Sequence, residues 1–468
     1  MGNSTQHSAS GANGAGHFET DDYYKPFPPN YFAPKAGDQQ LNIGIVGAGI
    51  AGLTAAVALI FERSKFANEI GAAIHMCPNA TRILSYYEFD YEGGLATPLQ
   101  KVKITTYTLP RLPLSPVMHM SLLDAHTLDV LRSVAVPDTR QRYGAPWFLF
   151  HRVDLHLQLK KLATEPRPNT KSVAKINLSS EVADIDLEGA ISLTNGECVK
   201  KDLVVVADGV RSKFPSKVVG EGVPTQASPT GTAVYRFLIP TEKLLQDPET
   251  RPYFEGGGFH GSIARLKDAR LVWYPCRRGA LQNFGFFVPD TITGFDDEVW
   301  NIPASRDEFL KSVSQLHPDL QAICSKAEDL KLFRLCMRKK PIPSLTKGNV
   351  VLIGDASHPM LPHQAQGGAT SVEDGAALGV LFSHLGSKDE VHRRLELFQK
   401  LRFDRVSAIQ LLSSVGQDEI HKVVESAQPY FHHGPVPTTL DGLNEYNFTP
   451  NVMRDALELL QQDCKTDL

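Results

Sequence analysis

The sequence predicts an α/β protein, and two predicted strands far apart along the chain, each ending in a turn that contains glycine, are the main evidence. Residues 41–46 alternate between apolar and smaller or polar side chains, which predicts a strand, and they run into a glycine-rich turn at 47–52. Residues 350–353 form an apolar run rich in β-branched side chains, which predicts a buried strand ending at Gly354-Asp355. Because ligands of open α/β sheets bind at the carboxyl ends of the strands, both turns are candidate binding sites.

The composition is that of an ordinary globular protein. The chain has 468 residues, of which 42% are hydrophobic and 21% charged, and a chain of this length forms about two or three domains. The net charge of −4 gives no reason to expect a nucleic-acid or anionic-membrane partner. The cysteines are scattered and no His, Asp or Cys spacing is typical of a metal site, so we expect reduced thiols and no metal.

Targeting signals are not evident in the sequence. The longest nearly uninterrupted apolar run, residues 51–61, is shorter than the roughly 20 residues that a membrane span needs. Residues 1–38 lack an apolar signal-peptide core and are expected to form a mostly disordered extension. We therefore expect a cytoplasmic protein without a transmembrane segment. The one dense basic run, residues 338–340, is short and predicts a solvated turn.

The glycine-rich turn has the G-x-G-x-x-G spacing of a dinucleotide-binding fingerprint. Gly47 permits the tight turn, Gly49 lets a pyrophosphate approach the backbone, and Gly52 lets the following helix pack on the strand. Residues 53–59 are expected to continue that helix. An acid at the end of the next parallel strand binds the ribose in such units, and Glu62 is the candidate.

The connection between Gly52 and Glu62 is unusually short. A helix over residues 50–59 would descend about 15 Å, and a return strand needs four or five residues at about 3.3 Å each. Only residues 60–62 remain for that strand. The sequence therefore predicts an internal deletion or, alternatively, a shortened helix with a stub of a strand. In both cases the binding of an adenosine through Glu62 needs a direct test.

The stretch from Gly354 carries the most specific signal. A carboxylate after a strand can bind a sugar hydroxyl, and the amides of Gly367 and Gly368 at a helix start can bind a negatively charged ring system. The residues GDASHPMLP at 354–362, followed by QGG at 366–368 and ED at 373–374, closely resemble the GD motif of the FAD-dependent aromatic hydroxylases, which are single-component flavoprotein monooxygenases of the salicylate hydroxylase type.

Three further segments resemble motifs of the same family in the same order. Residues 69–74 resemble a loop laid against the flavin, with Ala73 in place of a glycine, and the resemblance implies cofactor contacts for Ala73 and His75. Arg152 matches the arginine of HRxDL, which reaches FAD, although it could also be a surface arginine at a helix start. Asp208 matches the DG motif, which touches FAD and the nicotinamide donor, although a DG turn after a strand is common.

Two polar residues in predicted strands of a second domain are the catalytic candidates. Arg236 and Tyr274 lie in strands predicted at 232–239 and 271–275, where the resemblance implies an arginine and a tyrosine facing the ring of the substrate. A buried arginine would strengthen the binding of an anionic substrate, and a tyrosine could donate or relay a proton. The alternative is that Arg236 pairs with a carboxylate in the core and that Tyr274 packs there.

The resemblance implies a discontinuous Rossmann-like FAD-binding domain of the glutathione reductase type, a β-sheet-rich substrate domain and C-terminal helices that serve as scaffold or as a dimer surface. The expected boundaries are these: an extension at 1–38, the FAD-binding domain at 39–85, 145–220 and 335–385, the substrate domain at 86–144 and 221–334, and the helical region at 386–468.

The implied activity is hydroxylation or epoxidation of an electron-rich aromatic compound, such as a polyketide or alkaloid intermediate of fungal secondary metabolism. NADPH or NADH would reduce FAD, and a flavin C4a-hydroperoxide would deliver the oxygen atom. Asp355 would hold the ribityl chain, Gly367 and Gly368 would stabilise charge on the flavin, and Pro362 would line its reaction face. We expect a monomer or a homodimer. Two rival hypotheses are an FAD oxidoreductase without oxygen insertion and an inactive relative that lacks flavin.

Overall fold

The computed structural model describes most of the chain. The described part comprises residue 27 and residues 35–56, 59–65, 72–99, 119–135, 138–166, 173–255, 262–291 and 301–466. The predicted extension, apart from residues 27 and 35–38, and residues 69–71 of the predicted flavin loop lie outside it.

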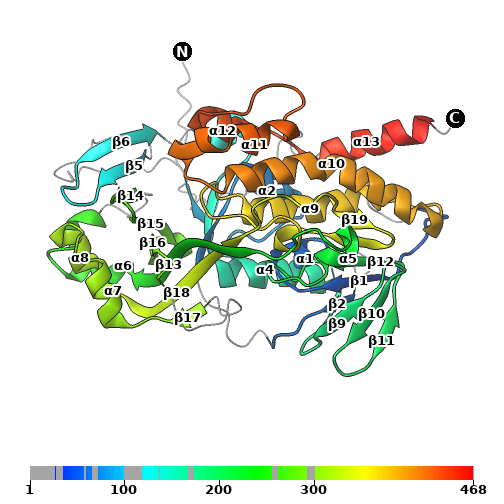
Figure 1. Ribbon diagram of the computed structural model, residues 1–468, viewed down its shortest axis with the longest axis horizontal. Coiled ribbons are helices and arrows are strands. Elements are labelled where there is room, and N and C mark those ends of the chain that lie inside the picture. The colour runs from blue at the N-terminus through cyan, green and yellow to red at the C-terminus, as the bar shows by residue number, and fades with distance from the viewer. Residues whose placement is uncertain are drawn as a thin grey trace, which may run out of the picture.

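A six-stranded sheet forms the centre of one half of the molecule, on the right in Figure 1. Its order is β19 (Thr346–Lys347), β20 (Val350–Leu352), β12 (Leu203–Val206), β1 (Ile43–Val46), β2 (Leu59–Phe61) and β8 (Lys175–Asn177). The strands from β20 to β8 are parallel, whereas β19 is antiparallel at the edge. β12 and β20 are buried along their whole length, as their continuous apolar sequences predict for strands covered on both faces.

The first crossover of this sheet is shortened. The expectation of a helix that continues over residues 53–59 is wrong, because α1 (Ile50–Thr54) has only five residues. β2 has only three residues, yet it pairs in parallel with β1. The alternative of a shortened helix and a stub of a strand is therefore the one observed. Ten residues suffice because neither element has the usual length.

An eight-stranded sheet forms the other half, on the left in Figure 1. Its order is β17 (Asn301–Pro303), β18 (Glu328–Met337), β13 (Ser228–Pro240), β16 (Leu281–Pro289), β15 (Arg270–Cys276), β14 (Ser262–Arg265), β5 (His119–Asp124) and β6 (Val130–Ala135). Phe237, Trp273, Phe284 and Phe286 lie on one face of this sheet and form a hydrophobic core with Phe309 and Leu320. Those last two residues come from the helices that cover this face, which are α6 (Thr241–Gln246), α7 (Arg306–Ser312) and α8 (Pro318–Cys324). The alternating burial of β15 leaves the other face available to line a cavity.

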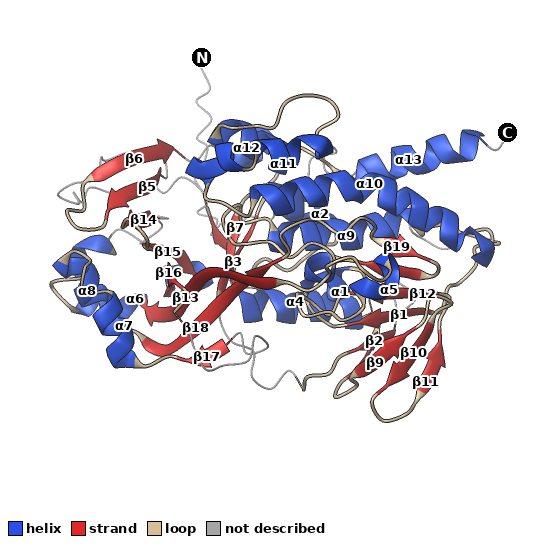
Figure 2. Ribbon diagram, in the orientation of Figure 1, coloured by secondary structure: helices blue, strands red, loops and turns tan. Residues whose placement is uncertain are grey.

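Two three-stranded sheets complete the β structure (Figure 2). The first contains β3 (Ala73–Met76), β7 (Phe148–His151) and β4 (Thr97–Pro98), and β15 contacts β7, so it lies where the two large sheets meet. The second contains β9 (Val182–Ile185), β10 (Ala190–Leu193) and β11 (Cys198–Lys200), and it projects at the lower right of Figure 2.

Helix α9 (Gly367–Leu381) is the centre of the helical layer above the six-stranded sheet. It packs against α1, α2 (Pro78–Tyr86), α10 (Val391–Leu412) and α13 (Val452–Thr466). The remaining helices are α3 (Thr139–Tyr143), α4 (Arg152–Thr164), α5 (Pro215–Val219), α11 (Val424–Ala427) and α12 (Leu440–Phe448). Val391, Phe398 and Met453 of the C-terminal helices belong to the same core as the six-stranded sheet. In the part of the chain that the structure describes, no helix is both long and apolar enough to cross a membrane.

Candidate cofactor and substrate site

Four sequence-predicted residues lie along one edge of the six-stranded sheet. β20, β12, β1 and β2 are adjacent and parallel, so their carboxyl ends share that edge. The residues that follow these strands are, in spatial order, Asp355, Asp208, Gly47 and Glu62. The topology thus brings together turns that are separated by up to three hundred residues of sequence.

The fingerprint glycines differ in what surrounds them. Gly47 has a φ of +99°, and a Cβ there would lie 2.6 Å from the carbonyl oxygen of Ala207. Gly52 packs directly against the backbone of Gly47. Gly49 has an ordinary φ of −73° and no atom within 4 Å of an added Cβ. Neither backbone conformation nor packing explains Gly49, so the open space in front of it suits a ligand that approaches the backbone.

Glu62 occupies the position expected of the ribose-binding acid. Its Oε2 accepts a hydrogen bond of 2.9 Å from the amide of Ala48, and its Oε1 accepts one of 2.8 Å from the amide of Ser64. Each carboxylate oxygen can accept more than one hydrogen bond, so a ribose hydroxyl can still donate to either one. Glu62 therefore reaches the fingerprint turn even though α1 is short.

The GD turn is held by a buried arginine that the sequence interpretation missed. Arg338 is 2% exposed, and its Nη1 and Nη2 donate to the carbonyls of Ser357 (2.7 Å) and Ala356 (2.8 Å), while its Nε donates to the carbonyl of Thr225. The prediction of a solvated turn at residues 338–340 is wrong for Arg338 and confirmed for Lys339 and Lys340, which are exposed. β18 ends at Met337, and the chain then turns under the GD loop.

The carboxylates beside Arg338 have raised pKa values. Burial raises the pKa of Asp208 to about 6, opposed by a hydrogen bond from Ser212 and more weakly by Arg338. Burial also raises the pKa of Asp355, opposed by the charges of His358, Arg152 and Arg338. Although protein surrounds Asp355, solvent reaches its side chain, and Oδ1 of Asp208 has no hydrogen-bond partner in the described structure. Oδ1 of Asp208 and the exposed carboxylate of Asp355 can therefore accept further hydrogen bonds.

A buried ionic network anchors the loop between the GD turn and α9. Nε2 of His358 lies 2.6 Å from Oδ2 of Asp374, which also accepts a hydrogen bond of 2.9 Å from the amide of Gly354. Arg402 of α10 binds Asp374 and Glu373, and Arg405 binds Glu373. Despite burial, Arg405 and Arg402 hold the pKa of Glu373 below its usual range. His358 is thus a loop anchor rather than a group facing the cavity.

The start of α9 faces β3. A Cβ on Gly368 would lie 2.6 Å from Cε of Met76 and 2.9 Å from Cδ1 of Ile74, so only glycine permits this close approach. No side chain caps the N-terminus of this fifteen-residue helix. Its first amides are therefore available to an acceptor, and the helix dipole favours a negative one.

The face of the eight-stranded sheet opposite its hydrophobic core carries the two catalytic candidates. Arg236 on β13 and Val272 on β15 flank Gly285 of β16 in register, and Tyr274 lies two residues along β15 on the same face. The Tyr274 hydroxyl donates a hydrogen bond of 3.1 Å to the carbonyl of Ala73. Burial raises the pKa of Tyr274, so its hydroxyl stays protonated near neutral pH. The centroid of the His75 ring lies 4.4 Å from that of Tyr274, edge to face.

Arg236 has no acidic partner among the residues that the structure describes. Its guanidinium lies over the ring of Phe333, 5.2 Å from the centroid, and no hydrogen bond or ion pair to it occurs within the described residues. Burial lowers the pKa of Arg236, and the positive charge of Arg152 lowers it further. The alternative that Arg236 pairs with a core carboxylate is thus not what the structure shows. A half-buried cation that faces another cation is suited to an anionic ligand.

His75 and Arg152 complete the wall between the two sheets. Burial lowers the pKa of His75 to about 4, so its ring is neutral, and its Nδ1 has no partner among the described residues. The Arg152 side chain is exposed to solvent, and its charge acts on both Arg236 and Asp355. The charge of Arg152 is therefore close enough to act on both the GD turn and the substrate sheet, and its contact with the cofactor stays a prediction.

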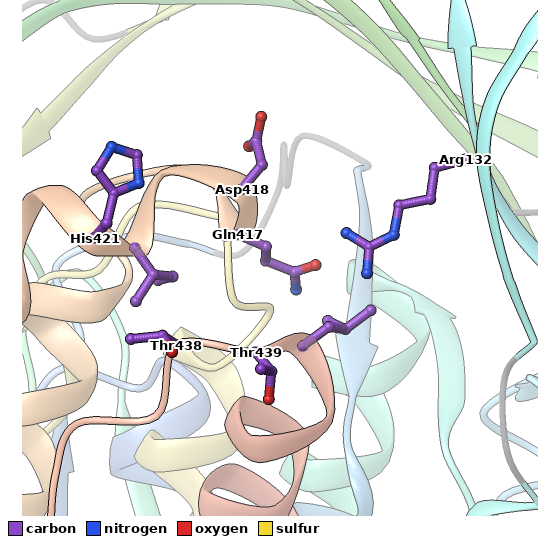
Figure 3. A pocket seen from close by; sticks show the side chains of 8 residues that line it. Arg132, Gln417, Asp418, His421, Thr438 and Thr439 are labelled. Atoms are coloured by element: carbon purple, nitrogen blue, oxygen red, sulfur yellow. The ribbon is translucent and has the colours of Figure 1, made fainter.

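A separate cavity of about 360 Å³ lies elsewhere, where β6, the turn at Gln417–Lys422 and the start of α12 meet (Figure 3). It is lined by Arg132, Gln417, Asp418, Ile420, His421, Thr438, Thr439 and Leu440. None of the sequence-predicted site residues lines it. Within the described residues, no three His, Cys, Asp or Glu side chains are arranged to hold a metal ion.

Other supporting residues also escaped the sequence interpretation. His156 of α4 is buried with Nε2 2.8 Å from the carbonyl oxygen of Ala48, in the fingerprint turn. Asn283 of β16 accepts a hydrogen bond of 3.1 Å from the amide of Ala73. His156 and Asn283 belong to ordinary helix and strand patterns, so no local signal distinguishes them.

The comparisons with known proteins agree with this geometry. Residues 192–410 match the model of the FAD binding domain family. The chain is 34% identical to the FAD-dependent monooxygenase phomE' of Diaporthe leptostromiformis over 86% of this chain and 97% of that protein. It is 29% identical to the hispidin-3-hydroxylase of Neonothopanus nambi over 81% of this chain and 85% of that protein.

The fold is also similar to that of a solved structure, a salicylate hydroxylase substrate complex. The TM-score is 0.62 with 21% sequence identity, and the match covers 91% of this chain and 94% of the other. At 21% sequence identity this likeness shows the fold, which is an α/β architecture with a Rossmann-like FAD domain. The family is shown by the monooxygenase phomE', to which the chain is 34% identical. The chain belongs to the FAD-dependent monooxygenases of the aromatic hydroxylase family.

Proposed function

We propose that this protein uses NAD(P)H and O2 to insert one oxygen atom into an electron-rich aromatic small molecule that carries a negative charge. In balance, the aromatic substrate, O2, NAD(P)H and a proton would give the hydroxylated product, water and NAD(P)+. The observation that carries the proposal is Arg236, a guanidinium on the face of the substrate sheet opposite its hydrophobic core, without an acidic partner in the described chain.

The residues present fit FAD. The open space at Gly49, the partnerless Oδ1 of Asp208 and the uncapped start of α9 are three unsatisfied features along one edge of the sheet. A pyrophosphate, a hydroxylated chain and an electron-poor ring would satisfy them in turn. The assigned cofactor contacts are Gly47, Gly49, Gly52, Glu62, Ala73, His75, Arg152, Asp208, Asp355 and Gly368. Bound FAD would supply electron transfer from NAD(P)H and the activation of O2.

Arg236 and Tyr274 would act on the substrate. The charge of Arg236 would hold a phenolate or carboxylate in place and favour the ionised form of a phenol, which makes its ring more electron-rich. The Tyr274 hydroxyl donates to Ala73, so its oxygen is left to accept a hydrogen bond from a substrate hydroxyl. His75 is neutral and would add an uncharged acceptor beside Tyr274.

The substrate class follows from this face of the sheet. Phe287 and Phe333 bring aromatic surface next to Arg236 and Arg270. An aromatic acid or phenol matches this combination of cation and ring. A fungal hydroxylase named for hispidin lies among the relatives, which supports an aromatic intermediate of secondary metabolism as the substrate. The proposed division into FAD-binding, substrate and C-terminal helical parts keeps the boundaries given above. A cytoplasmic location and a monomer or homodimer belong to the same proposal.

The first experiment is the visible absorption spectrum of the purified protein after desalting. We expect flavin bands near one FAD per chain, because Glu62 reaches the fingerprint turn despite the short α1. A folded, colourless protein that takes up no added FAD would favour the inactive relative. Insertion of a normal-length helix and strand between Gly52 and Glu62 should then restore flavin binding.

The second experiment separates oxygen insertion from simple oxidation. NAD(P)H consumption under isotopically labelled O2, with a panel of aromatic acids and phenols, should give a product that carries one labelled oxygen atom. NAD(P)H consumption that yields only hydrogen peroxide with every compound would favour the rival oxidoreductase. Arg236→Met should raise the KM of an anionic substrate about 10- to 100-fold, as expected for loss of a charge-assisted contact, whereas Arg236→Lys should retain part of the affinity.

A further inference from the structure

The turn between β15 and β16 makes a partly buried charge contact with the helix that carries Arg152. This turn, η3 (Arg277–Gly279), belongs to the same hairpin as Tyr274. Nε and Nη2 of Arg277 donate to Oδ2 and Oδ1 of Asp154 at 2.7 and 2.8 Å. Asp154 is 9% exposed and lies in the first turn of α4, two residues after Arg152. The pair therefore connects the substrate sheet to the start of α4.

The backbone of this turn is unusual. Arg277, Arg278 and Gly279 have φ values of +49°, +55° and +85° in succession. Two consecutive non-glycine residues with positive φ persist only when surrounding contacts hold them, and such strain concentrates at functional sites. The contact with Asp154 is one such restraint. The amide of Arg278 adds another by donating to Oγ1 of Thr97 at 2.7 Å.

Helix α4 links this contact to the cofactor edge. The amide of Arg152 donates to the carbonyl of Ala72 at 2.8 Å, and His156, one turn later, contacts the carbonyl of Ala48 in the fingerprint turn. Asp154 lies between them. A shift of the first turn of α4 would therefore displace Arg152 and disturb both neighbouring contacts.

One other basic group among the described residues lies near Asp154, and it is neutral while Arg277 is present. Nδ1 of His151 lies 3.8 Å from Oδ2 of Asp154, but burial and the charge of Arg277 lower the pKa of His151, so this ring is uncharged near neutral pH. Asp154 raises the pKa of Arg277 in return. Loss of Arg277 would leave a buried carboxylate without a counter-charge, and the start of α4 would have to move to solvate it.

We propose that Arg277 is a positioning residue: through Asp154 it fixes the first turn of α4, and so makes the placement of Arg152 at the cofactor depend on the substrate sheet. The inference rests on the proposed contact of Arg152 with FAD. Neither the sequence of the strained turn nor its distance from the cofactor edge suggests such a function. Arg277 itself does not touch the cofactor or the reacting atoms in this assignment.

The test compares FAD binding to the apoprotein of several variants, measured by quenching of flavin fluorescence well below each thermal midpoint. We expect Arg277→Met to weaken FAD binding about 2- to 30-fold, the range of coupling through packed networks, and Arg277→Lys to recover part of it. The visible circular dichroism of bound FAD should change in Arg277→Met, because it reports on the groups around the flavin. Asp154→Asn in the Arg277→Met background should cause little further loss.

A control with similar contact geometry, although with a more exposed acid, is available elsewhere in the chain. Arg142 forms a similar two-point contact with Asp441, at 2.5 and 2.9 Å, between α3 and α12. Arg142→Met should leave FAD affinity and flavin dichroism unchanged. Arg278→Gly, which relieves the positive φ without removing the ion pair, should bind FAD as tightly as the unaltered protein. These controls separate loss of the charge contact from general destabilisation.

The outcomes distinguish the inference from the function on which it rests. If Arg152→Gln weakens FAD binding but Arg277→Met only lowers the thermal midpoint, Arg277 is merely structural and the inference is wrong. If Arg152→Gln has no effect on FAD binding, the proposed role of Arg152 is wrong as well. If Arg277→Met does not fold, Arg277→Lys and Asp154→Asn decide, and normal affinity and dichroism in both would refute the inference.

Discussion

Replacement of Asp208 by asparagine should stabilise the apoprotein in a pH-dependent way. Burial raises the pKa of Asp208 from 3.8 to about 6. The folded state then binds more protons than the unfolded state between these two values, so the free energy of unfolding falls as the pH rises through this window. Each pKa unit corresponds to about 1.4 kcal/mol, so the penalty at pH 7.5 is at most about 3 kcal/mol. Solvent reaches the side chain, so we expect about 1–2 kcal/mol.

The assay is the thermal midpoint of the apoprotein with and without Asp208→Asn at several pH values from 4 to 8. The variant should gain about 1–2 °C at pH 7.5, because the entropy of unfolding of a chain of this length is about 1 kcal/mol/K. It should gain almost nothing at pH 4, where the carboxyl is protonated in the folded protein. The control is Asp184→Asn, because Lys217 holds the pKa of Asp184 below its usual value, which predicts a small loss of stability at pH 7.5. An equal gain from Asp208→Asn at both ends of the pH range would refute the argument.

Three further substitutions test the site by different measurements. Gly49→Ala should keep the thermal midpoint, since its Cβ meets no atom within 4 Å, but it should weaken FAD binding in a fluorescence titration. Gly47→Ala should lower the midpoint, because the φ of Gly47 is +99°. Equal midpoints for the two variants would contradict this prediction. Arg338→Met should lower the free energy of unfolding by about 3 kcal/mol or more, because charged hydrogen bonds are lost, and it should also lower FAD affinity. A change in only one of these two quantities would argue against the role of Arg338 at the GD turn. Tyr274→Phe should lower kcat and raise the fraction of NAD(P)H lost as hydrogen peroxide, because the hydroxyl that donates to Ala73 is removed; unchanged coupling would place Tyr274 outside the reaction.

The cofactor edge was largely predictable because its signals are local. A glycine fingerprint after an alternating strand, a DG turn and a GD turn each reflect a backbone conformation or close approach that few residues permit. The strands at 350–353 and 271–275, like the helix from Gly367, were also recognisable from apolar periodicity. The parallel order β20, β12, β1 and β2 then brings these turns to one edge.

The tertiary structure decided what the local patterns left open. The sequence showed that the segment from Gly52 to Glu62 was too short for normal elements, but only the fold shows that five helical and three strand residues still align Glu62 with Gly47. Arg338 looked like a solvated residue because its neighbours are lysines, yet three backbone carbonyls accept its hydrogen bonds. Hydrogen-bond partners distant in the chain leave no local trace.

The sequence by itself indicated the family and the candidate cofactor-binding turns and located the main strands along the chain, since these depend on periodicity, short motifs or a glycine conformation within a few residues. The spatial order of the strands came from the tertiary structure. Only the tertiary structure decided that Arg236 lacks an acidic partner in the described chain, that Asp208 and Asp355 share Arg338, and that Arg277 holds Asp154. These facts depend on charges brought together from distant segments, because burial and pairing are set by packing and not by neighbouring residues.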